Sequence, residues 1–348
     1  MTLGRIAILG SGETSHAGGR IFETLARLLP RPLRIAILET PAGFELNASL
    51  VAGRVGEFLK TRLGNYKPII DLIPARKKGI EFSPDNAEIL KPLLQANLIF
   101  MGPGSPTYLV RQLKDTLAWD IIRARHRQGA TLVFSSAAAI SAGQWVLPVY
   151  EIYKAGEDAH VKDGLNLLSD FGMRVSFIPH WNNTDGGADL DTSRCFIGVE
   201  RFEQWRAMLP PESAVVGLDE HTGVIMDFKT GACEVVGSGS VSIEREHDPE
   251  ICPSGSKFSL GELGGIRLPD PVHSGIPEDV WRMTREAQKS AEEGPSEKIL
   301  ALLEERRQAR ANRDFAASDR LRDEIAALGW KIKDTKSGQE LERLQGEN

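Results

Sequence analysis

The sequence has few cysteines, few aromatic residues and no long apolar run. Only three of its 348 residues are cysteines, Cys195, Cys233 and Cys252, and no two of them form a C-x-x-C pair. This spacing argues against a zinc ribbon, an iron–sulfur site or a disulfide framework. No stretch approaches the roughly 18–20 apolar residues of a membrane helix, and no signal peptide is visible. We therefore expect a cytoplasmic protein without a membrane partner.

Neither sign of charge is in large excess. The chain has 42 Lys and Arg against 48 Asp and Glu, which gives a formal net charge of -6. A basic surface over the whole molecule, which is typical of nucleic-acid-binding proteins, is therefore excluded, while a local basic patch stays open. The hydrophobic share of 41% and the charged share of 26% are ordinary for globular proteins, and they exclude disorder of the whole chain.

Short apolar runs alternate with helical patterns through the first two thirds of the chain. The runs lie at residues 5–9, 33–38, 67–73, 96–101 and 130–134. Strands without polar alternation, separated by helices, predict a mostly parallel sheet covered on both faces, which is a doubly wound α/β domain. Ligands of such sheets bind at the carboxyl ends of the strands, so the candidate site lies in the loops there.

Beyond residue 213 the pattern changes to short β runs punctuated by glycine. The runs lie at residues 215–218, 223–228, 233–236 and 240–243. They predict hairpins that add antiparallel edge strands to the same sheet. We assign residues 1–247 to this domain and expect residues 248–294, rich in proline, glycine and serine, to form a linker.

Residues 295–348 predict a small helical hairpin domain. A first helix begins after Pro295, Asp314 can cap a second helix that Gly329 ends, and residues 330–333 suggest a short strand. Such a piece is too small to bury much core without docking elsewhere. Its arginines are nearly balanced by acidic residues, so a solvated helix pair or a docking module is an alternative to an RNA-binding site.

The segment TLVFSSAAAISAG at residues 131–143 has the clearest chemical signal. A strand ends in two serines and a helix starts with alanines, which is the layout of a nucleophile elbow with Ser136 at the turn. Free N–H groups at the helix start help to stabilise an oxyanion. Phe134 and Ala138 stand where the strict G-x-S-x-G pattern has glycines, and close packing of small residues is the alternative interpretation.

A serine nucleophile needs a base and a group that orients the base. His180, in the segment FIPHW, is the best of seven histidines because it follows a short apolar strand. The alternative is a histidine packed against Trp181. Carboxylates follow the elbow at Glu151, Glu157 and Asp158. Glu151 is preferred because apolar residues bracket it, and a carboxylate in such surroundings needs a partner.

Two glycine-rich loops follow predicted strands. Residues 102–107, GPGSPT, can bring backbone N–H groups to a substrate carbonyl, as an oxyanion hole requires. Residues 10–13, GSGE, begin a dinucleotide fingerprint that is not completed, because Ser15 stands at the third glycine position. We therefore expect no nucleotide cofactor and no metal.

Taken in order, these motifs resemble one family. The glycine-rich loop, the serine turn, a carboxylate, the PHW segment and the strand end GLDEHT at residues 217–222 are similar to those of the cyanophycinase and aspartyl dipeptidase family. Its members are serine peptidases with the class I glutamine-amidotransferase-like fold, which is similar to that of flavodoxin. The resemblance covers about residues 4–245.

The resemblance implies roles for five residues. It implies a Ser–His–Glu triad of Ser136, His180 and Glu151, and an oxyanion hole at Gly104 and Ala137. Chemistry of the glutamine amidotransferase type is disfavoured, because it uses a cysteine nucleophile and no cysteine lies at the turn.

The same resemblance implies a small or acidic peptide or isopeptide as the substrate. Asp191 and Arg194 match the family's polar segment for an acidic group, which Arg194 can bind through two hydrogen bonds. Pro103 and Pro106 each remove an N–H donor from the glycine-rich loop, so a binding pocket without catalysis is the alternative.

The C-terminal segment has a resemblance of its own. Arg306-x-x-x-Arg310, the DFA at residues 314–316 and the IKDT at residues 332–335 look like the C-terminal extension of cysteinyl-tRNA synthetases, associated with anticodon recognition. The resemblance implies tRNA contact through four arginines, Arg306, Arg307, Arg310 and Arg313. None of the synthetase catalytic motifs appears. A serine hydrolase and a non-catalytic protein that binds tRNA or a partner through this tail are thus the two candidate functions, and self-association is left open.

Overall fold

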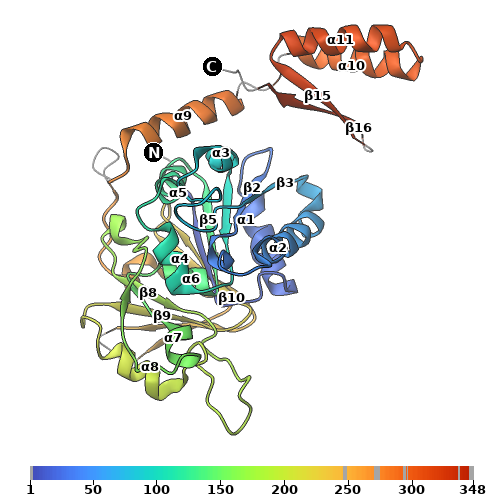
Figure 1. The fold of residues 1–348 in the computed structure, drawn as a ribbon. Helices are drawn as coiled ribbons and strands as arrows, with labels where there is room; N and C mark the ends of the chain where they lie inside the picture. Colours follow the sequence, from blue (N-terminus) through green and yellow to red (C-terminus); the bar gives the residue numbers. More distant parts are fainter. Residues whose placement is uncertain are drawn as a thin grey trace. The chain divides into compact units, whose positions relative to one another are not determined.

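The computed structural model describes residues 3–245, 249–269, 275–292, 295, 297–335 and 338–344. Contacts divide the chain into two compact units, Met1–Arg285 and Glu286–Asn348. Figure 1 labels the elements of both units and colours them along the chain. No helix among these described ranges is long and apolar enough to cross a membrane.

An eight-stranded sheet forms the centre of the first unit, in the order β14-β11-β10-β1-β5-β4-β2-β3. The parallel strands are β1 (Ile6–Leu9), β2 (Arg34–Leu38), β3 (Ile69–Ile73), β4 (Leu98–Met101) and β5 (Thr131–Ser135). The antiparallel strands are β10 (Thr222–Asp227), β11 (Ala232–Gly237) and β14 (Lys257–Ser259). The predicted α/β class, with a mostly parallel sheet between helices, is confirmed.

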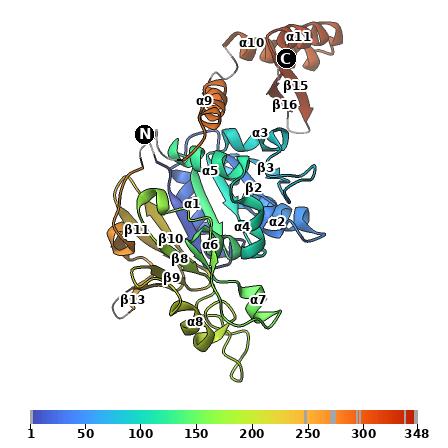
Figure 2. The same cartoon turned by 60° about the vertical axis from the view of Figure 1, so that its left-hand side comes forward.

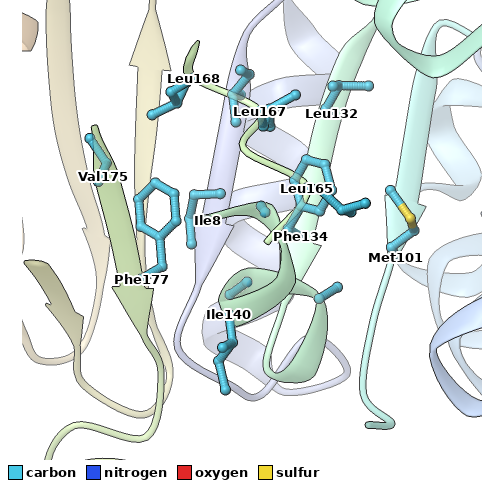
Figure 3. Close-up of a cluster of buried hydrophobic side chains, with 14 of the residues drawn as sticks. Ile8, Met101, Leu132, Phe134, Ile140, Leu165, Leu167, Leu168, Val175 and Phe177 are labelled. Atoms are coloured by element: carbon cyan, nitrogen blue, oxygen red, sulfur yellow. The ribbon is translucent and has the colours of Figure 1, made fainter. Parts of the chain in front are cut away.

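Helices cover both faces of this sheet. The first face packs against α1 (His16–Arg27) and α2 (Ala48–Arg62). The second packs against α3 (Ala87–Gln95), α4 (Pro106–Leu113), α5 (Leu117–Arg127) and α6 (Ala137–Ala142). Successive strand side chains point to opposite faces, so Val133 joins the first core and Phe134 the second. Figure 3 shows Phe134 in this second core with Ile8, Ile140 and Phe177.

A second sheet of four strands lies next to β10, in the order β13-β12-β9-β8. Its strands are β8 (Val175–Ile178), β9 (Ala214–Leu218), β12 (Ser240–Glu244) and β13 (Glu250–Pro253). Figures 1 and 2 both show β8 and β9 on the β10 side of the large sheet. The runs at 215–218 and 240–243 therefore differ from the prediction, which placed them at the edge of the large sheet. Strands β9 and β12, which contain these runs, pair with each other, and β9 also pairs with the wholly buried strand β8.

Shorter elements complete the first unit. They are β6 (Trp145–Val146), β7 (Lys162–Asp163), α7 (Val149–Tyr153), α8 (Gly198–Arg206), η1 (Thr40–Ala42), η2 (Gly64–Tyr66), η3 (Ser169–Phe171) and η4 (Leu260–Leu263).

Residues 249–269 also have regular structure, which differs from the predicted linker over 248–294. Strand β13 pairs with β12, and β14 pairs with β11. Their side chains Cys252 and Phe258 are buried. Proline, glycine and serine are as common in turns between short strands as in linkers, so the composition of this segment does not distinguish the two. Helix α9 (Glu278–Glu292) follows, with Val280 and Trp281 buried.

The described residues of the second unit form the end of α9, two further helices and a β hairpin. These are α10 (Glu297–Ala311), α11 (Phe315–Ala327), β15 (Trp330–Thr335) and β16 (Gly338–Arg343). Asp314 caps α11 by accepting a hydrogen bond from the N–H of Ala317 at 2.9 Å. The buried core is Ile299, Ile325 and Ile332. Strand β16 was not predicted, because its sequence GQELER has no apolar alternation.

Candidate active site

Ser136 lies at a sharp turn between β5 and α6. Its backbone, at φ 53° and ψ -119°, is in a region that non-glycine residues rarely adopt. This is the strained geometry that a nucleophile elbow uses to expose a serine hydroxyl. Phe134 and Ala138, which replace the glycines of the strict motif, are fully buried. Both residues therefore belong to the core.

His180 lies next to Ser136, as its place at a strand end predicts. Its Nε2 is 2.9 Å from Ser136 Oγ, within hydrogen-bond distance. His180 follows β8, and its own backbone is in the left-handed region, with φ 51°. Its N–H donates to the carbonyl of Gly10, after β1, at 3.3 Å. Loops after three strands, β1, β5 and β8, thus meet at the carboxyl edge of the two sheets.

The carboxylate beside His180 is Glu220, in the turn between β9 and β10. Its Oε1 is 2.8 Å from His180 Nδ1 and accepts a hydrogen bond from Asn183 Nδ2 at 3.0 Å. Burial raises the pKa of Glu220, but the hydrogen bonds from His180 and Asn183 outweigh it and hold that pKa below its usual range. The site thus has an ionised carboxylate against the imidazole.

Glu151, which we expected to orient His180, does not contact it. Glu151 lies on α7, and its Oε1 pairs with Lys162 Nζ at 3.4 Å. Burial raises the pKa of Glu151, and hydrogen bonds from Thr107 and Lys162 lower it by more, so that the net pKa is below its usual range. Its position between apolar residues is explained by this local partner. Glu220 was present in the segment GLDEHT at residues 217–222, which is the signal that could have identified it.

Of the two expected oxyanion-hole residues, Ala137 lies at the start of a helix and Gly104 lies in a loop. Ala137 is the first residue of α6, where N–H groups have no acceptor within the helix. Gly104 has φ 150°, and a Cβ there would lie 1.9 Å from the carbonyl oxygen of Pro41. Only glycine therefore fits between the loop after β4 and η1.

The two residues expected to bind an acidic group both have local partners. Asp191 accepts hydrogen bonds from the N–H groups of Ser193, at 2.9 Å, and Val199, at 2.8 Å. The Arg194 guanidinium lies 3.7 Å from the centre of the Trp181 ring, and its Nη1 donates to the Trp181 carbonyl at 3.1 Å. Asp191 therefore orders the loop, and Arg194 is a cation held against an aromatic face.

The turn after β1 brings a further carboxylate to Ser135, the neighbour of Ser136. Ser135 Oγ donates to Glu13 Oε2 at 2.8 Å, and Ser135 is fully buried. Over the described ranges, no group of three or more His, Cys, Asp or Glu side chains is arranged to hold a metal ion.

The four arginines expected to contact RNA differ in their surroundings. Arg306 is 1% exposed and makes two hydrogen bonds to Asp334, at 3.0 and 3.1 Å. Arg310 also pairs with Asp334, at 2.8 Å, and the exposed Arg307 pairs with Glu304. Arg306 is therefore a structural residue of the second unit. Arg313, at the turn between the helices, is exposed.

Fold and site together define an α/β protein with a serine, a histidine and a glutamate linked by hydrogen bonds at the carboxyl edge of its sheets. A crystal structure of a peptidase from an acI-B1 Actinobacterium has the same fold, with a TM-score of 0.59 and 21% sequence identity. The match covers 74% of this chain and 97% of that one. At this identity the comparison shows the fold alone.

The second unit is similar to a different kind of protein. Residues 293–341 match the family model of the cysteinyl-tRNA ligase anticodon binding domain. Over 47 residues the chain is 60% identical to the cysteine–tRNA ligase of Streptococcus thermophilus (strain CNRZ 1066) and 53% identical to that of Phocaeicola vulgatus. The match covers 14% of this chain and 10% of each ligase, so the chain spans about a tenth of the length of these relatives.

Proposed function

We propose that the first unit is a serine-type hydrolase that cleaves a small peptide or isopeptide. The observation that carries this is the continuous arrangement of Ser136 Oγ, the His180 ring and Glu220, with distances of 2.9 and 2.8 Å. An ionised Glu220 accepts a hydrogen bond from Nδ1–H of His180, which leaves Nε2 as the acceptor for the serine hydroxyl. This is the protonation state that a general base needs.

The proposed reaction has two stages. Ser136 Oγ attacks the substrate carbonyl carbon while its proton passes to His180 Nε2, and the N–H groups of Ala137 and Gly104 are assigned to the resulting oxyanion. His180 then protonates the leaving amine as the C–N bond breaks, which leaves an ester on Ser136. In the second stage His180 takes a proton from a water molecule as the water oxygen attacks the ester carbonyl carbon. The bond between that carbon and Ser136 Oγ then breaks, His180 returns the proton to Oγ, and the acid product leaves.

The substrate class rests on Arg194. A guanidinium held against Trp181 is a fixed cation that an acidic group of a small peptide can approach. The test is mass spectrometry of products from a panel of dipeptides and isopeptides with aspartate at the scissile bond, beside matched peptides with asparagine. We expect cleavage of the aspartate compounds and none by a Ser136→Ala variant. Equal cleavage of the asparagine compounds would contradict the acidic specificity.

A second candidate function belongs to the second unit. Its similarity to an anticodon-binding domain supports contact with tRNA, and the exposed Arg313 is the cation we assign to that contact. The test is filter binding of the full chain to a tRNA with a cysteine anticodon and to the same tRNA with its anticodon exchanged. We expect Arg313→Ala to weaken binding several-fold and to reduce its salt dependence. The matched control is Arg201→Ala, which replaces an exposed arginine of α8 in the first unit. Equal binding of both tRNAs, unaffected by Arg313→Ala, would contradict the proposal.

A further inference from the structure

Three consecutive residues next to His180 are in the left-handed region. Arg194, Cys195 and Phe196 have φ values of 55°, 62° and 71°, and none is glycine. Each such residue costs conformational free energy, because its Cβ crowds the following carbonyl. A run of three persists only where the surrounding contacts fix it, and strain of this kind is concentrated at functional sites.

Backbone hydrogen bonds tie this turn to the residues at the end of β8. The N–H of Cys195 donates to the carbonyl of His180 at 3.1 Å, and the N–H of Arg194 donates to that of Trp181 at 3.0 Å. The carbonyl groups of the histidine and its neighbour are therefore held by the left-handed turn itself.

The last residue of the turn places an aromatic ring against the imidazole. The Phe196 ring centre is 5.2 Å from that of His180, with 46° between the planes. The Phe196 ring centre also lies 6.0 Å from that of Tyr153, the last residue of α7. The rings of His180, Phe196 and Tyr153 thus form a packed series, and Phe196 is only partly buried.

These contacts restrict the remaining freedom of the imidazole. Ser136 and Glu220 contact its two nitrogen atoms, and the broad minima of the histidine χ2 torsion leave the ring some freedom to rotate about its Cβ–Cγ bond within these hydrogen bonds. An aromatic ring packed on the imidazole removes that freedom. Phe196 does this without an acid, base or hydrogen bond of its own.

We propose that Phe196 is a positioning residue for His180, and that the left-handed turn Arg194–Phe196 exists to place it. The proposal rests on the hydrolase function above. The strain has a function in this proposal: the turn gives up backbone stability so that the Phe196 ring packs on the imidazole.

The test compares three full-length variants by the rate at which a fluorophosphonate labels Ser136. Phe196→Leu removes the ring and keeps apolar bulk, Phe196→Tyr keeps the ring, and Phe171→Leu removes a buried ring that stacks on Phe228 away from the site. We expect Phe196→Leu to slow labelling about tenfold or more, as small misplacements of catalytic groups do. Phe196→Tyr and Phe171→Leu should both keep the wild-type rate of labelling. An unchanged rate in Phe196→Leu would overturn the proposal.

A second measurement separates this proposal from the hydrolase function. Proton NMR of the seven histidines follows the downfield Nδ1–H signal of His180 in its hydrogen bond to Glu220. We expect that signal in the wild type, the Phe196→Tyr variant and the Phe171→Leu variant, and its broadening or loss in Phe196→Leu. If the wild type is not labelled but the signal responds to Phe196 in this way, the hydrolase function fails and the positioning role stands. A signal that does not change in Phe196→Leu overturns the positioning role, whatever the labelling shows.

Discussion

His180 Nδ1 lies 2.8 Å from Glu220 Oε1, although the two residues are 40 positions apart in the chain. The turn between β9 and β10 supplies the carboxylate, and the N–H of Glu220 donates to Asn182 Oδ1 at 2.8 Å. Asn183 donates to the same Oε1. Neighbours on the histidine loop therefore hold both the backbone and the side chain of Glu220, so that the carboxylate is placed by the segment that contains its partner.

Replacing Glu220 should reduce the reactivity of Ser136 far more than replacing Glu151. Glu220→Gln removes the charge that stabilises a protonated His180, and it permits the wrong tautomer. We expect the rate of fluorophosphonate labelling to fall by about 10²- to 10⁴-fold. Glu151→Gln, which loses only the Lys162 pair, should change it less than threefold. A larger loss with Glu151→Gln than with Glu220→Gln would restore Glu151 as the orienting carboxylate.

The buried imidazole of His126 should make folding sensitive to acid. Burial, with a smaller effect of Arg127, lowers the pKa of His126 from 6.5 to about 3. Below pH 6.5 the unfolded chain binds a proton that the folded protein excludes, so the free energy of unfolding falls as the pH falls towards 3. The slope is about 1.4 kcal/mol per pH unit once the unfolded histidine is protonated.

Urea unfolding between pH 7.5 and 4.5 measures this effect. His126→Gln removes the titration and can still donate to the carbonyl of Gly4, which His126 Nε2 contacts at 2.9 Å. We expect a flatter dependence of stability on pH in this variant. Parallel curves for the two proteins would show that His126 does not contribute to the acid sensitivity.

Arg306 should stabilise the second unit, whereas its neighbour Arg307 should not. Arg306→Ala removes a buried side chain and both hydrogen bonds to Asp334, and we expect a loss of about 2 kcal/mol, moderated by the partial exposure of Asp334. Hydrogen exchange of the amides of α10 and β15 measures the loss directly. Arg307→Ala, which breaks an exposed pair with Glu304, should leave this exchange unchanged. Equal protection in the two variants would contradict the structural role of Arg306.

The three thiols should be unreactive in the folded protein. Burial raises the pKa of Cys195 and of Cys233, with smaller contributions from Glu220 and Glu262, and burial together with Glu250 raises that of Cys252 to about 11. A thiol reagent that needs the thiolate should therefore react with none of them at pH 8, and with all three after denaturation. Rapid reaction of a single thiol in the folded protein would contradict this prediction and would make that cysteine a candidate nucleophile.

Most of the large sheet could be predicted from the sequence, because its parallel strands are buried on both faces and appear as continuous apolar runs. For the same reason the sequence could indicate Ser136 and His180 as candidates that lie close together, since each follows such a run. The carboxylate that contacts His180 could not be identified from the sequence, because Glu151 lies closer to Ser136 along the chain than Glu220 does. Glu220 reaches His180 only through the pairing of β8 with β9 in a second sheet that the periodicity does not reveal.

The pairing of short strands accounts for the other differences. Strands β13 and β14 are four and three residues long, and turns rich in proline, glycine and serine separate them, so composition alone could not distinguish them from a linker. The role of Arg306 depends on Asp334, 28 residues further along, and no local pattern connects the two. The many arginines of this segment therefore suggested an RNA-binding surface, whereas Arg306 is a buried side chain paired with the partly exposed Asp334.

The most direct test of the account is intact-mass analysis of the folded protein after treatment with a fluorophosphonate. We expect one adduct, mapped by peptide sequencing to Ser136, absent from Ser136→Ala and strongly slowed in His180→Ala. Ser135→Ala, which changes the buried neighbour that hydrogen-bonds Glu13, is the matched control and should keep the adduct. Absence of any adduct, or an adduct that persists in Ser136→Ala, would contradict an activated serine at this site.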